Sequence, residues 1–289
     1  MDKLSKRLFF SLAATFSLSL SILFKKMVLL ADVQPLELLL QFTIITALLL
    51  SINLLFIQKK DVTKLNKIKI FQWISLFLAG SSLLAAFLFT TFGLNFTTSI
   101  NYSFITRSNL IFTSIFAFFF LKEKMGFKKI LLIISFFVGI YLVTTKGKTI
   151  IPQFGDLLIL IGATFFSSCS VIQKKISFSL PPEVISWGVT LSAAMLAILV
   201  AILLKINLFP SNSFIFIFLV GLAEASIIFF MNKTIQIANV TYYAMMTMLV
   251  PIINGILGIF FLNEQLTTIQ IIGGTIIILC GIFVQKLKY

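Results

Sequence analysis

A stretch of 22 residues occurs twice in this chain, first at residues 102–123 and again at residues 243–264. With a constant shift of 141 and no gap, eight of the 22 positions are identical. Both copies are long apolar runs that end in a glutamate, Glu123 in the first copy and Glu264 in the second. This recurrence predicts a chain built by duplication, with the two copies in equivalent places of one fold. We expect each glutamate to be structural, capping the helix that follows it or pairing with a nearby lysine.

The rest of the chain is also dominated by apolar runs. Hydrophobic residues make up 59% and charged residues 11% of the 289 residues, whereas soluble domains have roughly 25% charged residues. Most runs have about the 20 residues that cross a bilayer as a helix. The predicted spans are residues 8–30, 35–57, 70–92, 97–121, 127–145, 155–174, 183–204, 214–232, 236–262 and 267–285. The pattern predicts an all-α polytopic membrane protein with ten transmembrane helices.

Lysines and arginines lie mostly in alternate loops. With the N-terminus in the cytoplasm, 17 of them fall on the cytoplasmic side and three to five on the other side. This asymmetry predicts that both termini are cytoplasmic, in the cytoplasmic (inner) membrane of a bacterium. Because the net charge of +14 is spread in short clusters between apolar runs, we do not expect a nucleic-acid partner.

The duplication divides the ten spans into two sets of five. The predicted units are residues 1–148 and 149–289. Since five is odd, the second unit must enter the membrane in the opposite direction, which makes an inverted repeat. Inverted repeats are typical of transporters, whose substrate site lies near the membrane midplane between the halves. The alternative at this stage is a duplicated membrane scaffold that transports nothing.

The end of each fourth helix carries a resemblance to a known family. The residues on which the resemblance rests are Phe120–Met125 with Gly139, and Phe261–Leu266 with Gly273, Gly274 and Gly281. In this respect the chain resembles the EamA-type transporters of the drug/metabolite transporter superfamily. The resemblance implies an integral-membrane carrier whose central helices line one cavity, and it does not fix the substrate.

Pro251 also matches this family, which places a proline in the corresponding helix. In the first copy the equivalent residue is Leu110. The resemblance therefore implies that the helix of the first copy is less prone to a kink at this level.

Polar side chains form one stripe along each copy of the repeated helix. In the first copy they fall within about 160° of a helical wheel. Lipid offers polar groups no partners, so this stripe must face protein or water. The residues predicted to line a substrate cavity are Tyr102, Ser103, Thr106, Arg107, Tyr243, Thr247 and Asn254.

Lys25 and Lys26 follow the small residues of the first helix. Both could extend to the outer membrane interface. The alternative, which the family resemblance favours, is that one ammonium group attracts an anionic group of the substrate. The sequence does not decide which of the two lysines faces the cavity.

Arg107 and Glu224 are ionisable residues inside predicted spans. Each is the eleventh residue from the outer end of its span, so both should lie near the midplane. A lone charge there costs at least about 2.5–3.5 kcal/mol. One hypothesis is a fixed salt bridge between the two. The other is that Arg107 receives a carboxylate or phosphate of the substrate, which releases Glu224 for proton coupling.

Several functions are disfavoured by what the sequence lacks. There is no histidine, the nine acidic residues are scattered, and no phosphate-binding glycine-rich loop is present. Cys169 and Cys280 lie in apolar runs and are predicted to be packing residues. We therefore expect no enzyme, cofactor or metal site, and a lipid-modifying membrane enzyme is the least favoured alternative. The predicted function is secondary active transport of a small amphipathic metabolite, amino-acid-like or nucleoside-like, by alternating access.

Overall fold

A computed structural model describes residues 3–57, 68–121, 126–146, 153–206, 213–238 and 240–286. Every regular element in these ranges is a helix. In chain order the helices are α1 (Lys3–Leu30), α2 (Pro35–Ile52) with its continuation η1 (Asn53–Ile57), α4 (Ile70–Asn95), α5 (Ser99–Ile105), α6 (Ser108–Leu121), α7 (Phe127–Thr145), α8 (Phe154–Ile176), α9 (Pro182–Leu203), α10 (Phe214–Ile237), α11 (Val240–Met246), η3 (Thr247–Leu249), α12 (Val250–Leu262) and α13 (Thr268–Lys286). Each predicted span corresponds to one helix or to one set of consecutive helical segments.

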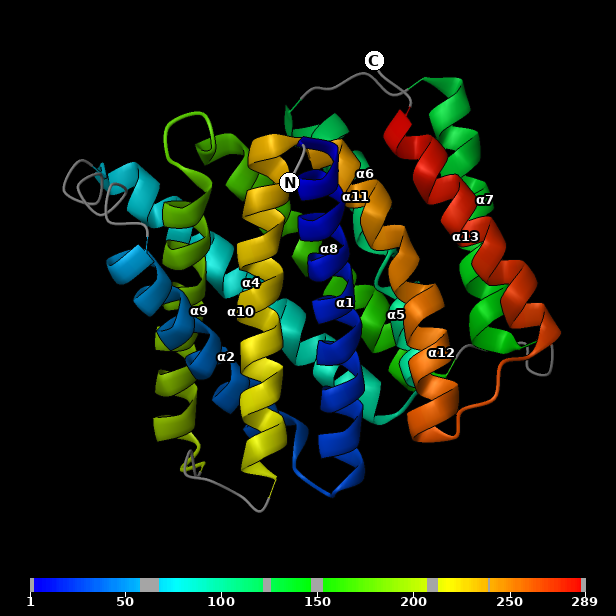
Figure 1. The fold of residues 1–289 in the computed structure, drawn as a ribbon, viewed down its shortest axis with the longest axis horizontal. Coiled ribbons are helices and arrows are strands. Elements are labelled where there is room, and N and C mark those ends of the chain that lie inside the picture. Colours follow the sequence, from blue (N-terminus) through cyan, green and yellow to red (C-terminus); the bar gives the residue numbers. More distant parts are fainter. Residues whose placement is uncertain are drawn as a thin grey trace.

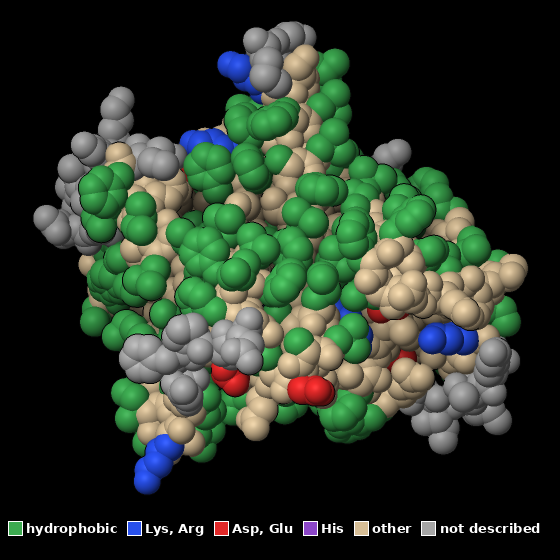
Figure 2. Space-filling view, turned by 60° about the horizontal axis from the view of Figure 1, so that its bottom comes forward, with side chains coloured by type: hydrophobic (Ala, Val, Ile, Leu, Met, Phe, Trp, Pro, Cys, Tyr) green, Lys and Arg blue, Asp and Glu red, His purple; other side chains and the backbone are tan. Residues whose placement is uncertain are grey.

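The helices have the length and apolarity of membrane spans. Within the described ranges, nine segments are long and apolar enough to cross a bilayer, and Thr268–Val284 is a shorter apolar helix. Many large apolar side chains point outward, among them Phe127, Ile215 and Phe260. Figure 2 shows apolar side chains over most of the face that it presents, with only a few charged groups. The predicted fold class, an all-α polytopic membrane protein, is confirmed.

The tightest helix pairs join the two halves of the chain (Figure 1). α1 packs along α10, and α4 packs along α8, which is the equivalent pair when the halves are exchanged. α7 packs along α13, its own counterpart. In Figure 1, α1 begins and α13 ends at the same end of the bundle. The halves are therefore interlocked, and their packing repeats the duplication that the sequence shows.

Two glycines separated by the same shift of 141 demonstrate this symmetry in atomic detail. A Cβ on Gly80 of α4 would lie 2.5 Å from Cβ of Ser192 in α9. A Cβ on Gly221 of α10 would lie 2.5 Å from Cγ2 of Ile45 in α2. Both glycines thus allow a helix to approach the second helix of the other half closely.

The fourth helix of each half is interrupted near its middle. α5 and α6 are separated by Thr106 and Arg107, while α11 and α12 are separated by Thr247–Leu249. Thr106 and Thr247 are equivalent residues of the repeat. Interrupted helices of this kind are a recurring feature of transporters built from inverted repeats.

The first copy is interrupted even though Leu110 replaces the proline, but the interruption lies at Thr106 and Arg107, before Leu110, and α6 runs through Leu110. Near Thr106 the backbone changes from α-helical to tighter hydrogen bonds, with Arg107 N donating to Phe104 O at 3.1 Å and Leu110 N donating to Arg107 O at 3.1 Å. The Thr106 hydroxyl also donates to Tyr102 O at 2.8 Å. A threonine that bonds back to its own helix competes with the regular ladder and bends it. The break therefore forms without a proline.

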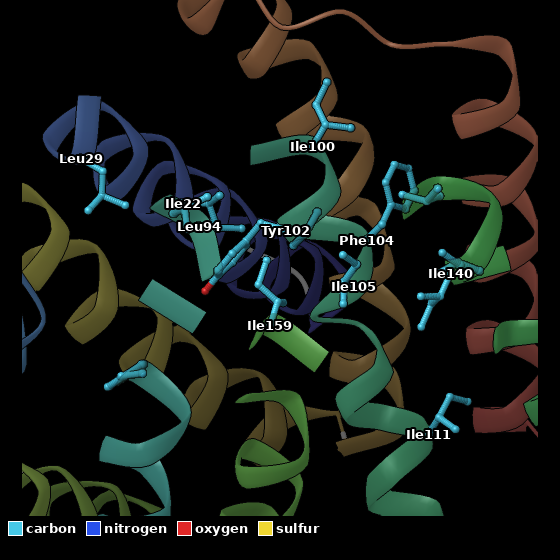
Figure 3. Packing of buried hydrophobic residues seen from close by; sticks show 14 of the residues in the cluster. Ile22, Leu29, Leu94, Ile100, Tyr102, Phe104, Ile105, Ile111, Ile140 and Ile159 are labelled. Carbon is cyan, nitrogen blue, oxygen red and sulfur yellow. The ribbon is translucent and has the colours of Figure 1, made fainter. Parts of the chain in front are cut away.

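α5 is anchored by side chains that leave it in opposite directions (Figure 3). Tyr102 extends toward Ile22 of α1 and Ile159 of α8, whereas Phe104 extends toward Ile140 of α7. The Phe104 ring also lies against Gly274 of α13, where an added Cβ would be 2.4 Å from the ring. This short helix is therefore held between the centre of the bundle and the α7–α13 pair.

Candidate functional site

A cavity of about 350 Å³ lies between the two halves of the bundle. Its wall combines residues of α1, α4, α5, α6, α8, α9, α10 and α11 with Thr247 of η3. Most of the wall is apolar, and its polar part contains three charged residues, Lys25, Arg107 and Glu224. The cavity therefore joins a large apolar surface to a small charged region, which is typical of sites for small organic molecules.

The cavity extends toward one end of the bundle. From α8 it takes residues between Phe166 and Gln173, in the later half of that helix, and from α10 residues from Glu224 near the middle to Ile235 near the end. From α9 it takes residues between Ser186 and Thr190, in the earlier half. Since neighbouring spans alternate in direction, these segments lie toward the end where α1 begins. We call this the terminal end and the opposite one the closed end.

Five of the residues proposed from the polar stripe line this cavity. They are Tyr102, Thr106, Arg107, Tyr243 and Thr247. The two interruptions at Thr106 and Thr247 therefore meet at one cavity, with one contribution from each half. Whether these side chains contact a substrate stays a prediction.

Three other proposed residues lie outside the cavity wall. The Ser103 hydroxyl donates to Ile100 O at 2.7 Å, and Asn254 Nδ2 donates to Ser99 O at 2.8 Å. Lys26 Nζ donates to Leu94 O at 3.0 Å and to Thr97 O at 2.8 Å. These side chains do not line this cavity, because Ser103 bonds back to its own helix while Asn254 and Lys26 bond to backbone carbonyls of other segments. That they contact a substrate stays a prediction. Of the two lysines, it is Lys25 that faces the cavity.

Glu224 forms an ion pair with Lys25 and not with Arg107. The distance from Lys25 Nζ to Glu224 Oε1 is 2.6 Å, and the Ser21 hydroxyl donates to the same oxygen at 2.7 Å. The Lys25 ammonium also lies 4.4 Å from the centre of the Phe42 ring. The hypothesis of an Arg107–Glu224 salt bridge is therefore wrong. One signal for the true pair was the four-residue spacing of Ser21 and Lys25, which puts both on one face of α1.

Arg107 is buried at the break between α5 and α6, with 6% of its surface exposed. Its Nη1 donates to Thr247 O and its Nη2 to Thr106 Oγ1, both at a long 3.4 Å. Among the described residues its Nε has no hydrogen-bond partner. Throughout the described ranges, no carboxylate lies within ion-pair distance of this guanidinium. Arg107 thus presents an uncompensated positive charge to the cavity.

Glu264 connects the two halves at the closed end. Its Oε1 accepts from Ser99 N at 2.6 Å, and its Oε2 accepts from Ile100 N at 3.0 Å and from the Ser99 hydroxyl at 3.0 Å. We predicted a cap on the following helix or a pair with a nearby lysine. Glu264 instead caps α5 of the other half, while the start of α13 is held by Thr267 and Gln270. Glu123 lies outside the described residues.

Asp156 is a buried acid that the sequence analysis missed. It accepts from the Thr97 hydroxyl at 2.6 Å and lies 3.4 Å from Asn101 Nδ2, and Asn101 Oδ1 in turn accepts from Gln270 Nε2 at 2.8 Å. An acid in the first turn of an apolar segment was the available signal. Together with the Glu264 contacts, these bonds tie the starts of α5, α8 and α13 together. We call this set of bonds the closed-end network.

The arrangement defines a multi-pass membrane protein of two interlocked repeats with a central, partly charged cavity. The sequence pattern that defines the EamA-like transporter family matches residues 5–145 and again residues 153–285. The chain therefore belongs to the EamA-like transporter family, as the resemblance predicted. Members of this family are transporters and not enzymes. The boundary that we placed after residue 148 stays a prediction.

Solved structures agree with this fold. A crystal structure described only as "Crystal structure of protein" is similar to this chain with a TM-score of 0.64 and 16% sequence identity. The match covers 96% of this chain and 99% of the other. No curated protein sequence matches the chain significantly. At this identity the likeness supports the fold alone.

Proposed function

We propose that this protein is a secondary active transporter that moves a small amphipathic metabolite across the membrane by alternating access. The observation that carries the proposal is the cavity between the repeats, which extends toward the terminal end while hydrogen bonds join α5, α8 and α13 at the closed end. A carrier needs a substrate site that is open to only one side of the membrane at a time. In an inverted repeat the two halves can exchange conformations, and this exchange opens the substrate site to the other side of the membrane.

The wall supports the substrate class, amino-acid-like or nucleoside-like, that we propose. Apolar side chains such as Phe87, Phe166 and Ile227 offer contact to a hydrocarbon or aromatic body. Arg107 and the Lys25–Glu224 pair offer charge and hydrogen bonds to a polar group. Glu224 is our candidate for proton coupling, because protonation of its carboxylate would break a buried ion pair beside the substrate.

We place the protein in the cytoplasmic membrane of a bacterium with both termini inside, so that the cavity extends toward the cytoplasm. The support is the excess of Lys and Arg in the loops on that side. Reporter fusions after Lys60, Lys148 and Lys205 should report cytoplasm, outside and outside. A cytoplasmic signal at Lys148 would overturn the inverted orientation of the halves.

The transport proposal is tested with purified protein in liposomes. Labelled amino acids, α-keto acids, nucleosides and sugars are offered in pools, and counterflow into preloaded vesicles is measured. The Ala244→Trp variant should abolish uptake, since Ala244 lines the cavity and an indole there would fill it. Met195→Trp, on an exposed face of α9, is the matched control and should transport normally. Liposomes that remain inactive with every pool would favour the scaffold alternative.

A further inference from the structure

The charges in the cavity wall do not balance. Among the residues that line it, Lys25 and Arg107 carry positive charge and Glu224 carries negative charge. Lys25 and Glu224 neutralise one another across 2.6 Å. One positive charge, on Arg107, is therefore left over in a region shielded from water, where an uncompensated charge is costly.

Among the described residues, no carboxylate forms an ion pair with Arg107. Glu224 already accepts from Lys25 and from the Ser21 hydroxyl through one oxygen. The contacts that Arg107 does make go to neutral oxygens of Thr106 and Thr247, at the outer limit of hydrogen-bond distance. In the described part of the chain its Nε–H has no acceptor, although a guanidinium carries five donors.

The unused donors suit one type of ligand group. A guanidinium presents a planar fork that matches the two oxygens of a carboxylate, and such bidentate pairs are among the strongest hydrogen-bonded contacts. Arg107 lies at the break between α5 and α6, opposite the equivalent break of the other half. A carboxylate bound there would contact both interrupted helices, which are the elements that a change of access must move.

We infer that the substrate is an amphipathic monoanion, whose carboxylate binds Arg107 and whose apolar body occupies the wall formed by residues such as Phe87, Phe166 and Met231. This inference rests on the proposed function and narrows its substrate class. A monoanion brings the cavity to neutrality, whereas a zwitterion adds an ammonium group whose natural partner, Glu224, is already paired. An α-keto acid should therefore bind better than the amino acid with the same carbon skeleton.

The test measures thermal unfolding of the purified full chain in detergent. The probes are phenylpyruvate, phenylalanine and phenylethanol, which share an aromatic body and differ in charge. Phenylpyruvate should raise the Tm by at least about 3 °C at saturation, and the other two should raise it far less. Arg107→Lys should weaken this shift, because an ammonium keeps the charge but lacks the fork.

Arg107→Met gives a second readout that needs no ligand. Since the buried guanidinium is uncompensated, its removal should raise the Tm of the protein alone and abolish the phenylpyruvate shift. The matched control is Arg7→Met. Arg7 lies 4.8 Å from the centre of the Tyr242 ring and outside the cavity wall, so the phenylpyruvate shift should survive its replacement.

Three outcomes would overturn the inference. The first is an Arg107-dependent shift as large with phenylalanine as with phenylpyruvate. The second is the absence of any shift with phenylpyruvate in the native protein. The third is a lower Tm for Arg107→Met without ligand, which would mean that the guanidinium only holds the helices together. In each of these three cases, counterflow of a non-anionic substrate would still support the transporter proposal. Binding of phenylpyruvate without transport of any compound would instead contradict the transporter proposal and leave the monoanion site intact.

Discussion

Replacing Glu224 with leucine is expected to destabilise the protein by about 3–5 kcal/mol, because it leaves the Lys25 ammonium buried without its partner. Lys25 is 2% exposed, and its ammonium donates to no other oxygen than Glu224 Oε1 among the bonds that the described residues form. The Phe42 ring face offers only partial compensation. The change should be measured as a loss of folded protein in detergent and as a lower Tm.

The double variant Lys25→Met with Glu224→Leu should recover most of that stability, since an apolar pair of similar volume replaces the buried ion pair. The same double variant should not transport. A matched control is Glu37→Leu on α2, whose carboxylate accepts from Gln41 of its own helix at 3.1 Å. If Glu224→Leu unfolds no more readily than Glu37→Leu, the Lys25–Glu224 pair is not a determinant of the fold.

Replacing Glu264 with alanine is expected to open the closed end. The variant removes three hydrogen bonds to a carboxylate, and bonds to charged groups contribute about 1.5–3 kcal/mol each. Two conformations of a transporter differ by only a few kcal/mol. The loss should therefore shift the population toward a cavity that reaches the other side of the membrane.

The measurement is labelling of Thr106→Cys by a membrane-impermeant thiol reagent, in a background that lacks Cys169 and Cys280. With Glu264 present, labelling should occur from the terminal end. In the Glu264→Ala background labelling should also occur from the closed end, at least about tenfold faster than labelling from that end when Glu264 is present. Glu37→Ala serves as the control acid in this case too. If Thr106→Cys is still labelled only from the terminal end in Glu264→Ala, the Glu264 bonds do not keep the cavity closed.

The helices and their symmetry could be predicted from the sequence, because hydropathy and a fixed shift are properties of the chain itself. The apolar run at residues 127–145 and helix α7 have the same bounds. The shift of 141 placed Thr106 and Thr247 in equivalent positions, and both helices break there. The polar stripe also placed Tyr102 and Tyr243 together, and both line the cavity.

The partners of the charged residues could not be predicted in the same way. Counting residues gave Arg107 and Glu224 the same depth, but a common depth does not make two helices neighbours. α10 packs along α1, so Glu224 meets Lys25. Glu264 likewise caps a helix of the other half, and this contact depends on a fold in which the halves interlock. Asp156 was missed since its partner Thr97 is 59 residues away.

The ion pair between α1 and α10 also bears on how the protein is made. Lys25 and Glu224 are 199 residues apart, and ribosomes add about 5–20 residues per second. Lys25 is therefore inserted about 10 to 40 s before its only carboxylate partner among the described residues emerges. During that time its ammonium must extend to the interface or be shielded by a membrane insertase. Helix α1 consequently gains its final position only after α10, the eighth span, has been synthesised. Assembly of the bundle is therefore late and cooperative.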